Sequence, residues 1–449
     1  MNHNCYSSGF QPKDMVRILW GSEQPTRPTG YGIVSRNLIK RLVAKGHEVF
    51  VMGWDYNGED FLHPEGWTMV HAGISGYGSE NLGGPNSPTV LEATIKKLDI
   101  DIYISLIDPW YIGHAVMSTN KMSIPYIAYL PIDGFPISPA WKDILKMVHT
   151  PMWMSKFGKR TFTEFVKDYS SEGTRPVENR DGILDRYLTE DTPVLYHGVE
   201  LDIFKPITDE EKAELKEKMG IKWDFVFMSV ARNTNRKQIP RLLEAFSQFI
   251  HYNPDVPESV GLVLHCGDPT DTFGMGGWNL PALIAQYDLG DYVAFSDTSS
   301  NPLSGLTTEE MARLFQSCDV HIMATGGEGF GIPSAEAMAC GKPIILPDNS
   351  TGPELVGYGP QRRGWIAKSS THITGPQWGV NMTLVDIEDL AWKMRTAYEQ
   401  DEERKEFGEN ARKFAEKNFN WDVLTDQLEK QILKTAIEIH PLGGMSRVI

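Results

Sequence analysis

Glu328 and Glu336 stand at the two ends of a glycine-rich segment, with seven residues between them. The apolar residues 319–323 before the segment are expected to form a strand. A short helix is expected after it, because Pro333 suits a first helical turn and Gly341 a helix end. Free amides at such a helix start bind anions, and carboxylates beside them accept hydrogen bonds from sugar or ribose hydroxyls. The alternative is that Glu336 merely favours the helix dipole and that Glu328 is a solvated loop residue.

A second group of charged residues predicts an anion site. Arg232, Arg236 and Lys237 come directly after residues 225–231, which are expected to form a buried strand. Three cations at a strand end suit a diphosphate leaving group, because they stabilise the negative charge that grows as the bond breaks. The alternative is an ordinary set of surface cations.

Two glycines near the amino terminus are candidates for contact with the same ligand. Gly30 and Gly32 lie in an expected loop between a strand at residues 16–20 and an amphipathic helix. Glycine lets the backbone approach a phosphate or a sugar closely, because it has no side chain. A Gly-x-Gly pair by itself is weak support for a binding site, because it also occurs in loops without a ligand.

The elements that would position these residues alternate between expected strands and helices, which predicts two α/β domains with parallel sheets. The first half carries expected strands at residues 16–20, 47–52, 100–107, 125–131, 147–152 and 193–196. The second half carries them at residues 225–231, 261–265, 292–295, 319–323 and 342–346. A turn and a charged helix at residues 209–219 predict a domain boundary between residues 192 and 224, and residues 385–439 are expected to form two or three helices.

Composition excludes several classes of protein. The 449 residues suggest two or three domains, and 41% hydrophobic with 23% charged residues is typical of a soluble globular chain rather than a disordered one. Lys and Arg number 43 against 59 Asp and Glu, so the net charge is −16. This balance argues against a broad nucleic-acid surface, because phosphate binding draws on clustered Lys and Arg.

Targeting and redox signals favour a cytoplasmic protein. No apolar run approaches the ~18 residues of a membrane span, and the amino terminus lacks the pattern of a secretory signal. The four cysteines, Cys5, Cys266, Cys318 and Cys340, lie far apart in the sequence. A disulfide framework or structural zinc site is therefore not expected, and a reducing compartment is.

Four motifs together resemble a known family. The segment with the two glutamates resembles the Glu-x7-Glu signature of retaining glycosyltransferases of family 4. Arg232 and Lys237, five residues apart, are similar to the Arg/Lys pair of that family. Residues 197–206 resemble its interdomain turn, and residues 353–356 its later acidic motif. The motifs occur in the family's order, and the resemblance extends over residues 16–420.

The resemblance implies a fold and a domain organisation. The fold would be α/β of the GT-B type, with two facing Rossmann-like domains, parallel sheets and a deep interdomain cleft. Residues 1–203 would form the acceptor-side domain and residues 204–415 the nucleotide-sugar donor domain. The C-terminal helix within residues 416–449 would pack back on the N-terminal domain.

The resemblance also implies roles for individual residues. Glu328 would contact hydroxyls of the transferred sugar, Glu336 would contact the ribose, and Arg232 with Lys237 would bind the diphosphate. The backbone positions implied in donor binding are Gly30, Gly32, Gly329, Phe330, Gly331 and Ile332.

One position departs from the family pattern. Many members carry a histidine near the end of a first-domain strand, close to the sugar, whereas this chain has Asp133 as the best polar candidate after residues 125–131. Asp133 would orient the sugar or the acceptor as part of the catalytic site. The alternative is an ordinary turn, because Asp-Gly is a common turn pair.

The activity implied by the resemblance is retaining transfer of a hexose from a UDP- or GDP-sugar to a hydroxyl of a glycan, lipid, protein or small molecule. No cofactor and no metal are expected, because cations and helix amides take the place of a divalent ion. The alternatives are a glycoside phosphorylase or disaccharide synthase on the same fold, and a non-catalytic nucleotide-sugar-binding protein. A hydrolase that uses Glu328 and Glu336 as an acid/base pair is a third.

A basic stretch adds one alternative for the location of the protein. Lys156, Lys159, Arg160 and Lys167 could touch an anionic membrane or a phosphorylated acceptor, which would place a cytoplasmic protein peripherally at the inner membrane face. The other interpretation is a solvated helix face. The sequence does not determine the oligomeric state.

Overall fold

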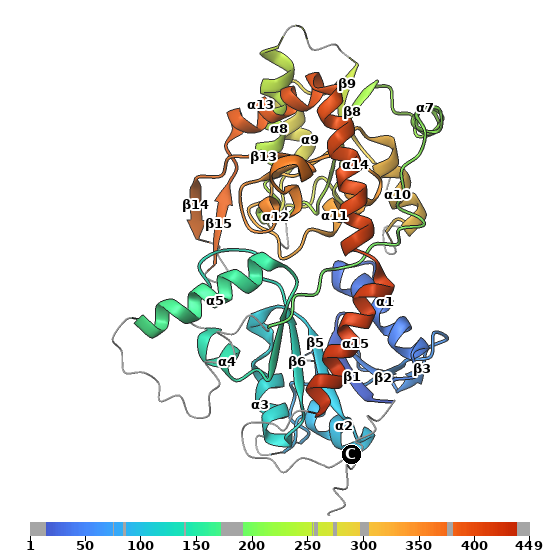
Figure 1. Cartoon of the computed structure of the whole chain (residues 1–449), viewed down its shortest axis with the longest axis vertical. Helices are drawn as coiled ribbons and strands as arrows, with labels where there is room; N and C mark the ends of the chain where they lie inside the picture. Colours follow the sequence, from blue (N-terminus) through green and yellow to red (C-terminus); the bar gives the residue numbers. More distant parts are fainter. Residues whose placement is uncertain are drawn as a thin grey trace, which may run out of the picture. The chain divides into compact units, whose positions relative to one another are not determined.

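The computed structural model of the chain contains two parallel sheets and the helices around them (Figure 1). It describes residues 15–74, 76–83, 87–138, 141–171, 192–253, 255, 259–272, 276–296, 305–374 and 380–437.

The first sheet has seven strands in the order β3-β4-β2-β1-β5-β6-β7. β1 pairs in parallel with β2 and β5, β2 with β4, and β5 with β6, whereas the short β3 is antiparallel to β4. Its strands are β1 (Arg17–Ser22), β2 (Glu48–Gly53), β3 (Phe61–Leu62), β4 (Thr68–Val70), β5 (Ile102–Leu106), β6 (Tyr126–Leu130) and β7 (Thr150–Trp153). The helical segments between and after them are α1 (Gly30–Ala44), α2 (Val90–Leu98), η1 (Pro109–Tyr111), α3 (Gly113–Met122), α4 (Lys142–Lys146) and α5 (Lys156–Ser171).

The second sheet has six strands in the order β10-β9-β8-β11-β12-β13, and all of its neighbouring pairs are parallel. Its strands are β8 (Phe225–Val230), β9 (Val260–His265), β10 (Val293–Phe295), β11 (Val320–Ile322), β12 (Ile344–Pro347) and β13 (Gly364–Ala367). The helices of this part are α7 (Asp209–Lys218), α8 (Ile239–His251), α9 (Leu280–Gln286), α10 (Thr308–Ser317), α11 (Ile332–Ala339), α12 (Gly352–Val356), α13 (Ile387–Glu399) and α14 (Asp401–Asn418). Short 3-10 turns are η3 (Asn235–Lys237) and η4 (Gly359–Gln361), and a hairpin of β14 (Thr371–Thr374) and β15 (Asn381–Leu384) stands apart from the sheet.

The strand order of the second sheet indicates which of its edges is suited to bind a ligand. From β8 the chain builds outward through β9 and β10, then crosses to β11 on the other side of β8. The loops that follow β8 and β11 therefore diverge at a topological switch point, where open α/β sheets bind ligands beyond the carboxyl ends of their strands.

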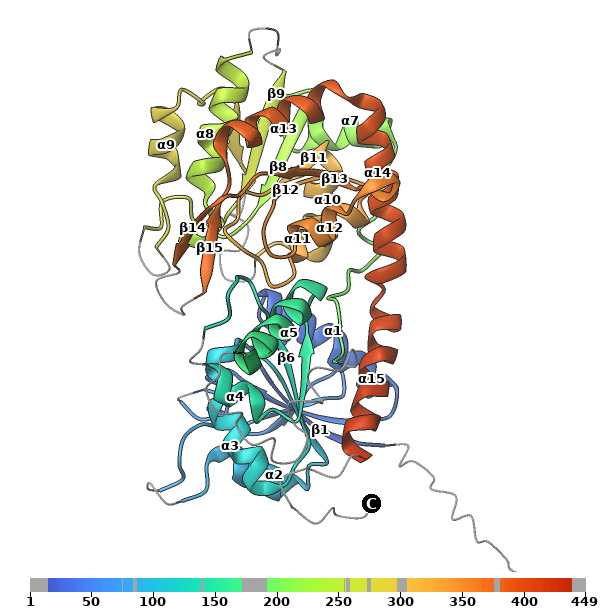
Figure 2. The same cartoon turned by 60° about the vertical axis from the view of Figure 1, so that its left-hand side comes forward.

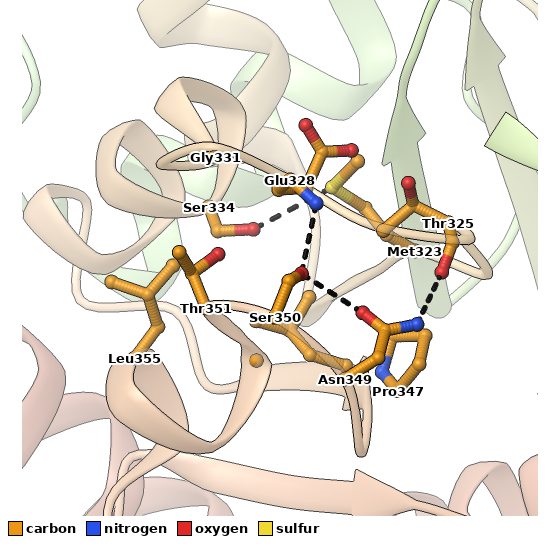
Figure 3. A pocket seen from close by; sticks show the side chains of 12 residues that line it. Met323, Thr325, Glu328, Gly331, Ser334, Pro347, Asn349, Ser350, Thr351 and Leu355 are labelled. Atoms are coloured by element: carbon orange, nitrogen blue, oxygen red, sulfur yellow. Dashed lines mark hydrogen bonds between the residues drawn. The ribbon is translucent and has the colours of Figure 1, made fainter. Parts of the chain in front are cut away.

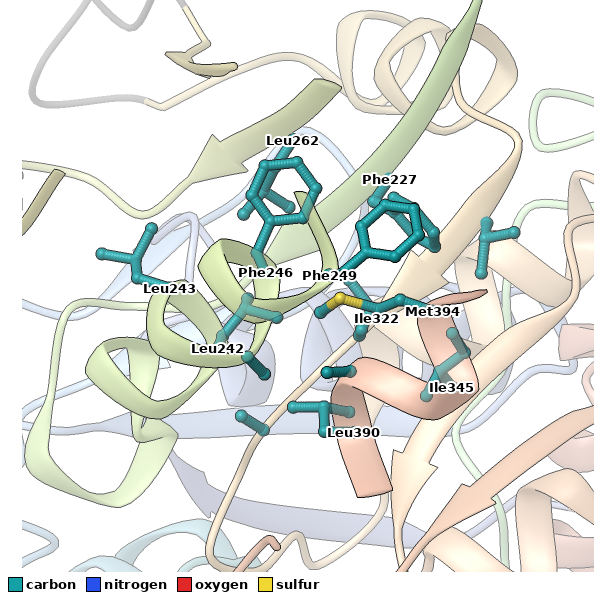
Figure 4. Packing of buried hydrophobic residues seen from close by; sticks show 14 of the residues in the cluster. Phe227, Leu242, Leu243, Phe246, Phe249, Leu262, Ile322, Ile345, Leu390 and Met394 are labelled. Atoms are coloured by element: carbon teal, nitrogen blue, oxygen red, sulfur yellow. The ribbon is translucent and has the colours of Figure 1, made fainter. Parts of the chain in front are cut away.

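A core of aromatic and branched side chains supports this edge. α8 turns Leu242, Phe246 and Phe249 toward the sheet, where they meet Phe227 of β8, and α13 packs beside α8 with Met394 among the same buried side chains (Figure 4). The apolar residues of α8 recur at helical spacing, so one face of the helix is buried while its other face stays polar. β8 is buried along its whole length, as a strand covered on both faces must be.

The last helix, α15 (Trp421–Ile437), packs beside the first sheet, in agreement with the predicted return of the chain (Figure 2). Lys45 Nζ lies 2.6 Å from an Asp426 carboxylate oxygen and 2.8 Å from one of Glu429. Nε2 of the buried His47 lies 3.1 Å from the other oxygen of Glu429. Residues 438–449, the end of the predicted C-terminal segment, lie outside the described residues.

The chain divides into two compact units. One contains the described parts of residues 1–129, 147–151 and 425–449, and the other contains those of residues 130–146 and 152–424. Both Rossmann-like sheets of the predicted fold are confirmed. The domain boundaries at residues 203 and 415, and the interdomain cleft, stay predictions.

Two local expectations differ from the structure. The expected strand at residues 193–196 is wrong: Val194 forms only an isolated bridge with Trp153, next to the end of β7. The hairpin of β14 and β15 was not expected, because its strands are only four residues each and one of them is mostly exposed. No helix within the described ranges combines the length and the apolar character needed to cross a bilayer.

Candidate functional site

Three loops at the carboxyl edge of the second sheet bring the candidate site together. The loop after β8 carries Arg232, Arg236 and Lys237, the loop after β11 carries Glu328, and the loop after β12 carries Ser350. β8, β11 and β12 are consecutive neighbours in the sheet, so the loops that follow them are adjacent.

Glu328 forms the centre of an ion-pair network. Its Oε1 lies 2.5 Å from Lys237 Nζ, and its Oε2 lies 3.1 Å from Arg236 Nη1. The 3-10 turn η3 places Arg236 and Lys237 side by side, and Arg236 also donates to the carbonyl oxygen of Gly327. Both Glu328 and Lys237 are nearly buried, with side chains 13% and 12% exposed. This carboxylate is therefore held between two cations and is not a solvated loop residue.

The two cations keep Glu328 charged. Burial by itself raises the pKa of Glu328, but Lys237 and Arg236 outweigh it and lower that pKa to about 2. Burial also lowers the pKa of Lys237, an effect that Glu328 opposes. At neutral pH the carboxylate accordingly accepts hydrogen bonds and does not donate them.

The loop after β12 holds the backbone of Glu328 in place (Figure 3). The Glu328 amide donates to Ser350 Oγ at 2.8 Å, and the Ser350 hydroxyl donates to Asn349 Oδ1 at 3.0 Å. Asn349 Nδ2 in turn donates to the carbonyl oxygen of Thr325 at 2.9 Å. Ser350 adopts a positive φ of 40°, which is unusual for a residue with a side chain. A pocket lies among these groups and is lined by Met323, Thr325, Glu328, Gly331, Ser334, Leu346, Pro347, Asn349, Ser350, Thr351, Gly352 and Leu355.

The glycine-rich loop passes close to other backbone, which only glycine permits. A Cβ at Gly327 would overlap the carbonyl oxygen of Asp133, and one at Gly329 would lie 2.6 Å from Pro131 Cβ. Gly331, the residue before α11, has a φ of +98° in the left-handed region. Each of these glycines is therefore required by the path of the chain.

The start of α11 offers free amides, as the sequence predicts. Pro333 occupies the first turn of α11. Within the described part of the chain, the backbone amides of Gly329, Phe330, Gly331 and Ile332 donate no hydrogen bond to another residue. Such amides at the start of a helix form an anion site, because the helix dipole adds to their partial charges.

Glu336 lies in α11 and is half-buried. Burial raises its pKa to about 8, so the carboxyl group is largely protonated at neutral pH and can both donate and accept a hydrogen bond. Its predicted contact with a ribose stays a prediction. The protonated state disfavours the alternative in which a charged Glu336 acts only on the helix dipole.

Arg232 and Asp133 differ in how they join the network. Asp133 Oδ2 lies 3.8 Å from Arg236 Nε, which places Asp133 beside the cations. Arg232 is exposed, and no carboxylate of a described residue pairs with it. The predicted pair of Arg232 and Lys237 thus consists of one free cation and one that is bound to Glu328.

Gly30 and Gly32 belong to the other compact unit. They lie in the first turn of α1, so the expectation of a loop at these residues is wrong. Thr29 caps this helix by accepting a hydrogen bond from the Gly32 amide at 3.1 Å. A Cβ at Gly32 would overlap the carbonyl oxygen of Arg27, so the close approach that glycine permits here is one within the chain itself. Their predicted contact with the donor stays a prediction.

Two residues of the network, Asn349 and Ser350, were not predicted from the sequence, and neither was the contact between Arg236 and Glu328. Arg236 belongs to the basic run that was recognised, but its pairing with Glu328 could not be read from spacing. Asn349 and Ser350 follow a correctly expected strand, and the position of polar residues after a strand end was the signal available for them.

Glu354, from the quoted acidic motif, has a structural partner. Its two carboxylate oxygens accept hydrogen bonds from the backbone amides of Lys156 and Phe157 at 3.0 and 2.9 Å, where α5 begins. The hydroxyl of Tyr196 donates to the same carboxylate at 2.5 Å. A carboxylate at the start of a helix satisfies free amides and favours the dipole, so Glu354 serves as a cap of α5.

Comparison with protein families matches residues 211–374 to the family described as "Glycosyl transferases group 1". Among curated proteins, an MMP alpha-(1->4)-mannosyltransferase of Mycolicibacterium hassiacum is 30% identical over 158 residues, which is 34% of this chain and 33% of that protein. A D-inositol 3-phosphate glycosyltransferase of Thermobifida fusca is 21% identical over 291 residues, which is 58% of this chain and 64% of that protein. The alignments of the first three curated relatives span about a third of each relative's length.

Solved structures match nearly the whole chain. A sucrose-phosphate synthase from Thermosynechococcus elongatus has a TM-score of 0.64 at 17% identity and covers 93% of this chain and 98% of its own. The Anabaena protein HepE, solved with UDP and glucose, has a TM-score of 0.64 at 16% identity and covers 93% of this chain and 99% of its own. The chain therefore has the GT-B fold of two Rossmann-like parts, and its residues 211–374 match the glycosyl transferases group 1 family.

Proposed function

We propose that this chain is a retaining glycosyltransferase of family 4 that moves a hexose from a UDP- or GDP-sugar to an acceptor hydroxyl. The observation that carries the proposal is the buried Glu328 carboxylate, held charged by Lys237 and Arg236 beside the free amides before α11. The family match at residues 211–374 contains all of these groups and supports the same activity.

The donor would lie along the edge of the second sheet. Its diphosphate would meet the amides of residues 329–332 and the free guanidinium of Arg232. Lys237 uses one of its three donors on Glu328 and has others for a phosphate oxygen. Glu328 would accept hydrogen bonds from hexose hydroxyls, and Glu336 would exchange one with the ribose.

The chemistry follows from this placement. The bond between the anomeric carbon and the diphosphate oxygen breaks, and the acceptor oxygen attacks the same face of the sugar. The departing phosphate takes the acceptor proton, so no residue has to act as a covalent nucleophile. The cations and amides stabilise the charge that grows on the diphosphate, which is the largest contribution such a site can make. Metal-independence is part of the proposal, since these groups would do the work of a divalent ion.

Ligand binding tests the proposal directly. The purified chain is heated with UDP-, GDP-, ADP- and dTDP-sugars and with their free diphosphates, with EDTA and with Mg²⁺. One nucleotide should raise the melting temperature whether or not metal is present, because a ligand that binds only the native state stabilises it. Release of the free diphosphate on addition of acceptor should follow. The absence of a shift with every nucleotide would contradict the proposal and favour a protein without a donor site.

A disaccharide synthase on the same fold is a second candidate. Solved synthases of sucrose-phosphate and of trehalose-phosphate match 93% and 94% of this chain, although at 17% and 14% identity they support the fold alone. Analysis of the product separates a free disaccharide from a glycan, lipid or protein conjugate. A phosphorylase would instead release a sugar 1-phosphate when phosphate is the acceptor.

A reducing, cytoplasmic location is proposed on the state of the cysteines. Cys266, Cys318 and Cys340 are free and buried. Burial raises the pKa of each of these thiols, to about 12 for Cys266 and about 11 for Cys318, so they stay protonated and unreactive.

A further inference from the structure

Aromatic rings gather at the carboxyl edge of the first sheet, in the compact unit that does not hold Glu328. The Trp54 ring centroid lies 4.6 Å from that of Tyr77 and 5.3 Å from that of Tyr111, with interplanar angles of 70° and 67°. Trp54 follows β2, Tyr77 follows β4 and Tyr111 follows β5, so three separate loops contribute. Tyr111 is 39% exposed and Trp54 is partly exposed, so both can offer ring surface to a ligand.

Carboxylates stand in the loops that carry these rings, with Asp55 next to Trp54 and Asp108 before Tyr111. Asp108 accepts a hydrogen bond from the Tyr31 hydroxyl at 2.7 Å and stands in the loop that leads to Tyr111. Burial raises the pKa of Tyr77, and the charges of Glu23, Asp108 and Asp55 raise it further. Carboxylate oxygens accept hydrogen bonds from ligand hydroxyls, whereas a phosphate group is mostly dianionic at neutral pH and is repelled by them.

This edge has almost no positive charge to offer an anion. The segments 23–29, 54–60, 71–89 and 107–114, which follow β1, β2, β4 and β5, contain six Asp and Glu against one Lys or Arg. That one cation, Arg27, donates through Nη2 to both oxygens of Asp55, at 2.9 and 3.2 Å. Burial lowers the pKa of His114, so its imidazole stays neutral at neutral pH. A phosphate at this edge would meet repulsion without a compensating charge.

A buried hydroxyl below the rings lacks a partner. The Tyr103 side chain is fully buried, and its hydroxyl has no hydrogen-bond partner among the described residues. The backbone of Tyr103 is opposite Leu19 of β1, but its hydroxyl would overlap a Cβ on Gly21, two residues further along β1. The side chain therefore points toward the carboxyl edge of the sheet. Burial raises the pKa of Tyr103, so the hydroxyl keeps its proton.

We propose that the acceptor is a sugar ring without a phosphate or carboxylate group, bound at this edge by the faces of Trp54 and Tyr111 and by the carboxylate of Asp108. The rings would pack on the C–H face of the sugar, and the carboxylate would accept hydrogen bonds from its hydroxyls. The inference rests on the proposed function, which it deepens by naming the class of acceptor. In this arrangement the cations that bind phosphate, Arg232 and Lys237, serve the donor only and not the acceptor.

Matched pairs of sugars test the acceptor class. The full chain is given its donor and either glucose or glucose 6-phosphate, mannose or mannose 6-phosphate, and maltose or maltose 1-phosphate, and release of the nucleoside diphosphate is measured. The neutral member of at least one pair should increase release at least about tenfold more than its phosphorylated counterpart. A preference for the phosphorylated members, or equal rates within every pair, would overturn the inference while leaving the transferase activity established.

Binding measured without turnover keeps the inference testable if no donor is found. Saturation-transfer NMR with the same pairs should detect the neutral sugars and not the phosphorylated ones. Trp54→Ala should abolish that signal, whereas Trp392→Ala should not, because Trp392 is an exposed tryptophan of α13 in the other compact unit. If no neutral sugar binds, or if binding survives Trp54→Ala, the inference is wrong. A lack of nucleotide binding in the thermal experiment would instead count against the proposed function.

One variant should shift the binding preference from neutral toward phosphorylated sugars. Asp55→Asn leaves Arg27 without its carboxylate partner, so a cation becomes available beside the rings. Binding of the phosphorylated sugars should rise at least about threefold relative to the neutral ones, since a charged hydrogen bond is stronger than a neutral one. An unchanged ratio would show that this edge does not contact the acceptor.

Discussion

Oε1 of Glu328 lies 2.5 Å from Nζ of Lys237, and this contact joins the loop after β11 to the loop after β8. The two residues are 91 positions apart in the sequence. Neither charge is solvated to any large extent, so Lys237 depends on Glu328 to remain charged, and Glu328 depends on Lys237 together with Arg236. The same two residues therefore hold the two loops together and are the proposed contacts of the sugar and the diphosphate.

Removing either charge should cut transfer. Glu328→Gln and Lys237→Met should each lower kcat at least about tenfold, which is the low end of the effect of losing one charge-stabilising contact. Steady-state release of the nucleoside diphosphate measures this, and circular dichroism confirms that each variant is folded. Wild-type rates in both folded variants would contradict the assignment of the site.

The double variant should reveal the coupling of the pair. Glu328→Gln leaves Lys237 without its carboxylate, and Lys237→Met leaves Glu328 with Arg236 alone, whereas the double substitution removes both charges of the pair. The losses in unfolding free energy should therefore not add. The Glu328 pKa of about 2 lies below the ordinary value, so its contribution is present above about pH 4.5 and is lost as the pH falls toward 2. The unfolding free energy of Glu328→Gln should therefore not fall in this way as the pH is lowered. The coupling would be contradicted if the losses of the two single variants added in the double variant and if Glu328→Gln lost stability in acid as the wild type does.

The Ser350 hydroxyl should matter through Glu328 rather than through the substrate. Ser350→Ala removes the acceptor of the Glu328 amide and should destabilise the loop by about 1–2 kcal/mol. The expected result is a lower kcat with a nucleotide dissociation constant close to that of the wild type. Ser247→Ala is a matched control, because the Ser247 hydroxyl of α8 donates a hydrogen bond to the Tyr287 carbonyl oxygen, just after α9, and not to the loops around Glu328. An equal kcat in Ser350→Ala and Ser247→Ala would show that Ser350 does not position Glu328 for the reaction.

Glu336 should make the protein less stable in mild alkali. Its pKa of about 8 in the folded state lies above the ordinary value of 4.5, so the folded state binds the proton more tightly than the unfolded one. The stability that this proton provides is complete below about pH 4.5 and declines as the pH rises through 8. Glu336→Gln should therefore gain melting temperature relative to the wild type between pH 5 and pH 9. A constant difference across this range would mean that the carboxyl group titrates normally.

Gly327 should tolerate no side chain. A Cβ there would overlap the Asp133 carbonyl oxygen, so Gly327→Ala must displace one of the two loops at a cost of about 1–3 kcal/mol, with loss of transfer activity. Gly290→Ala is the control, because a Cβ at Gly290 meets no atom within 4 Å and the residue does not have a positive φ. Its unfolding free energy should change by less than about 0.5 kcal/mol, as for other surface positions. Similar stability in the two alanine variants would show that the loops can separate freely.

The sequence alone determined which residues stand at the ends of the strands of the second sheet. Continuous apolar runs identified β8, β11 and β12, and the polar residues that follow such runs must lie at one edge of a parallel sheet. Pro333 and Gly341 also predicted the short helix after the glycine-rich loop, because both act through the local backbone. The GT-B fold and the identity of Glu328 and Lys237 as site candidates follow from these local signals and from the four motifs.

The tertiary structure alone decided which of these residues meet. Spacing within the basic run did not distinguish Arg232, which pairs with no carboxylate of the described residues, from Arg236, which pairs with Glu328. That pairing depends on the adjacency of β8 and β11 and on the turn η3. The support of Glu328 by Ser350, 22 residues away, likewise required the neighbouring strand β12. The local sequence pattern predicts which residues are buried and where the chain turns. The order of the strands and the direction of each side chain at the edge are set only when the whole sheet is assembled.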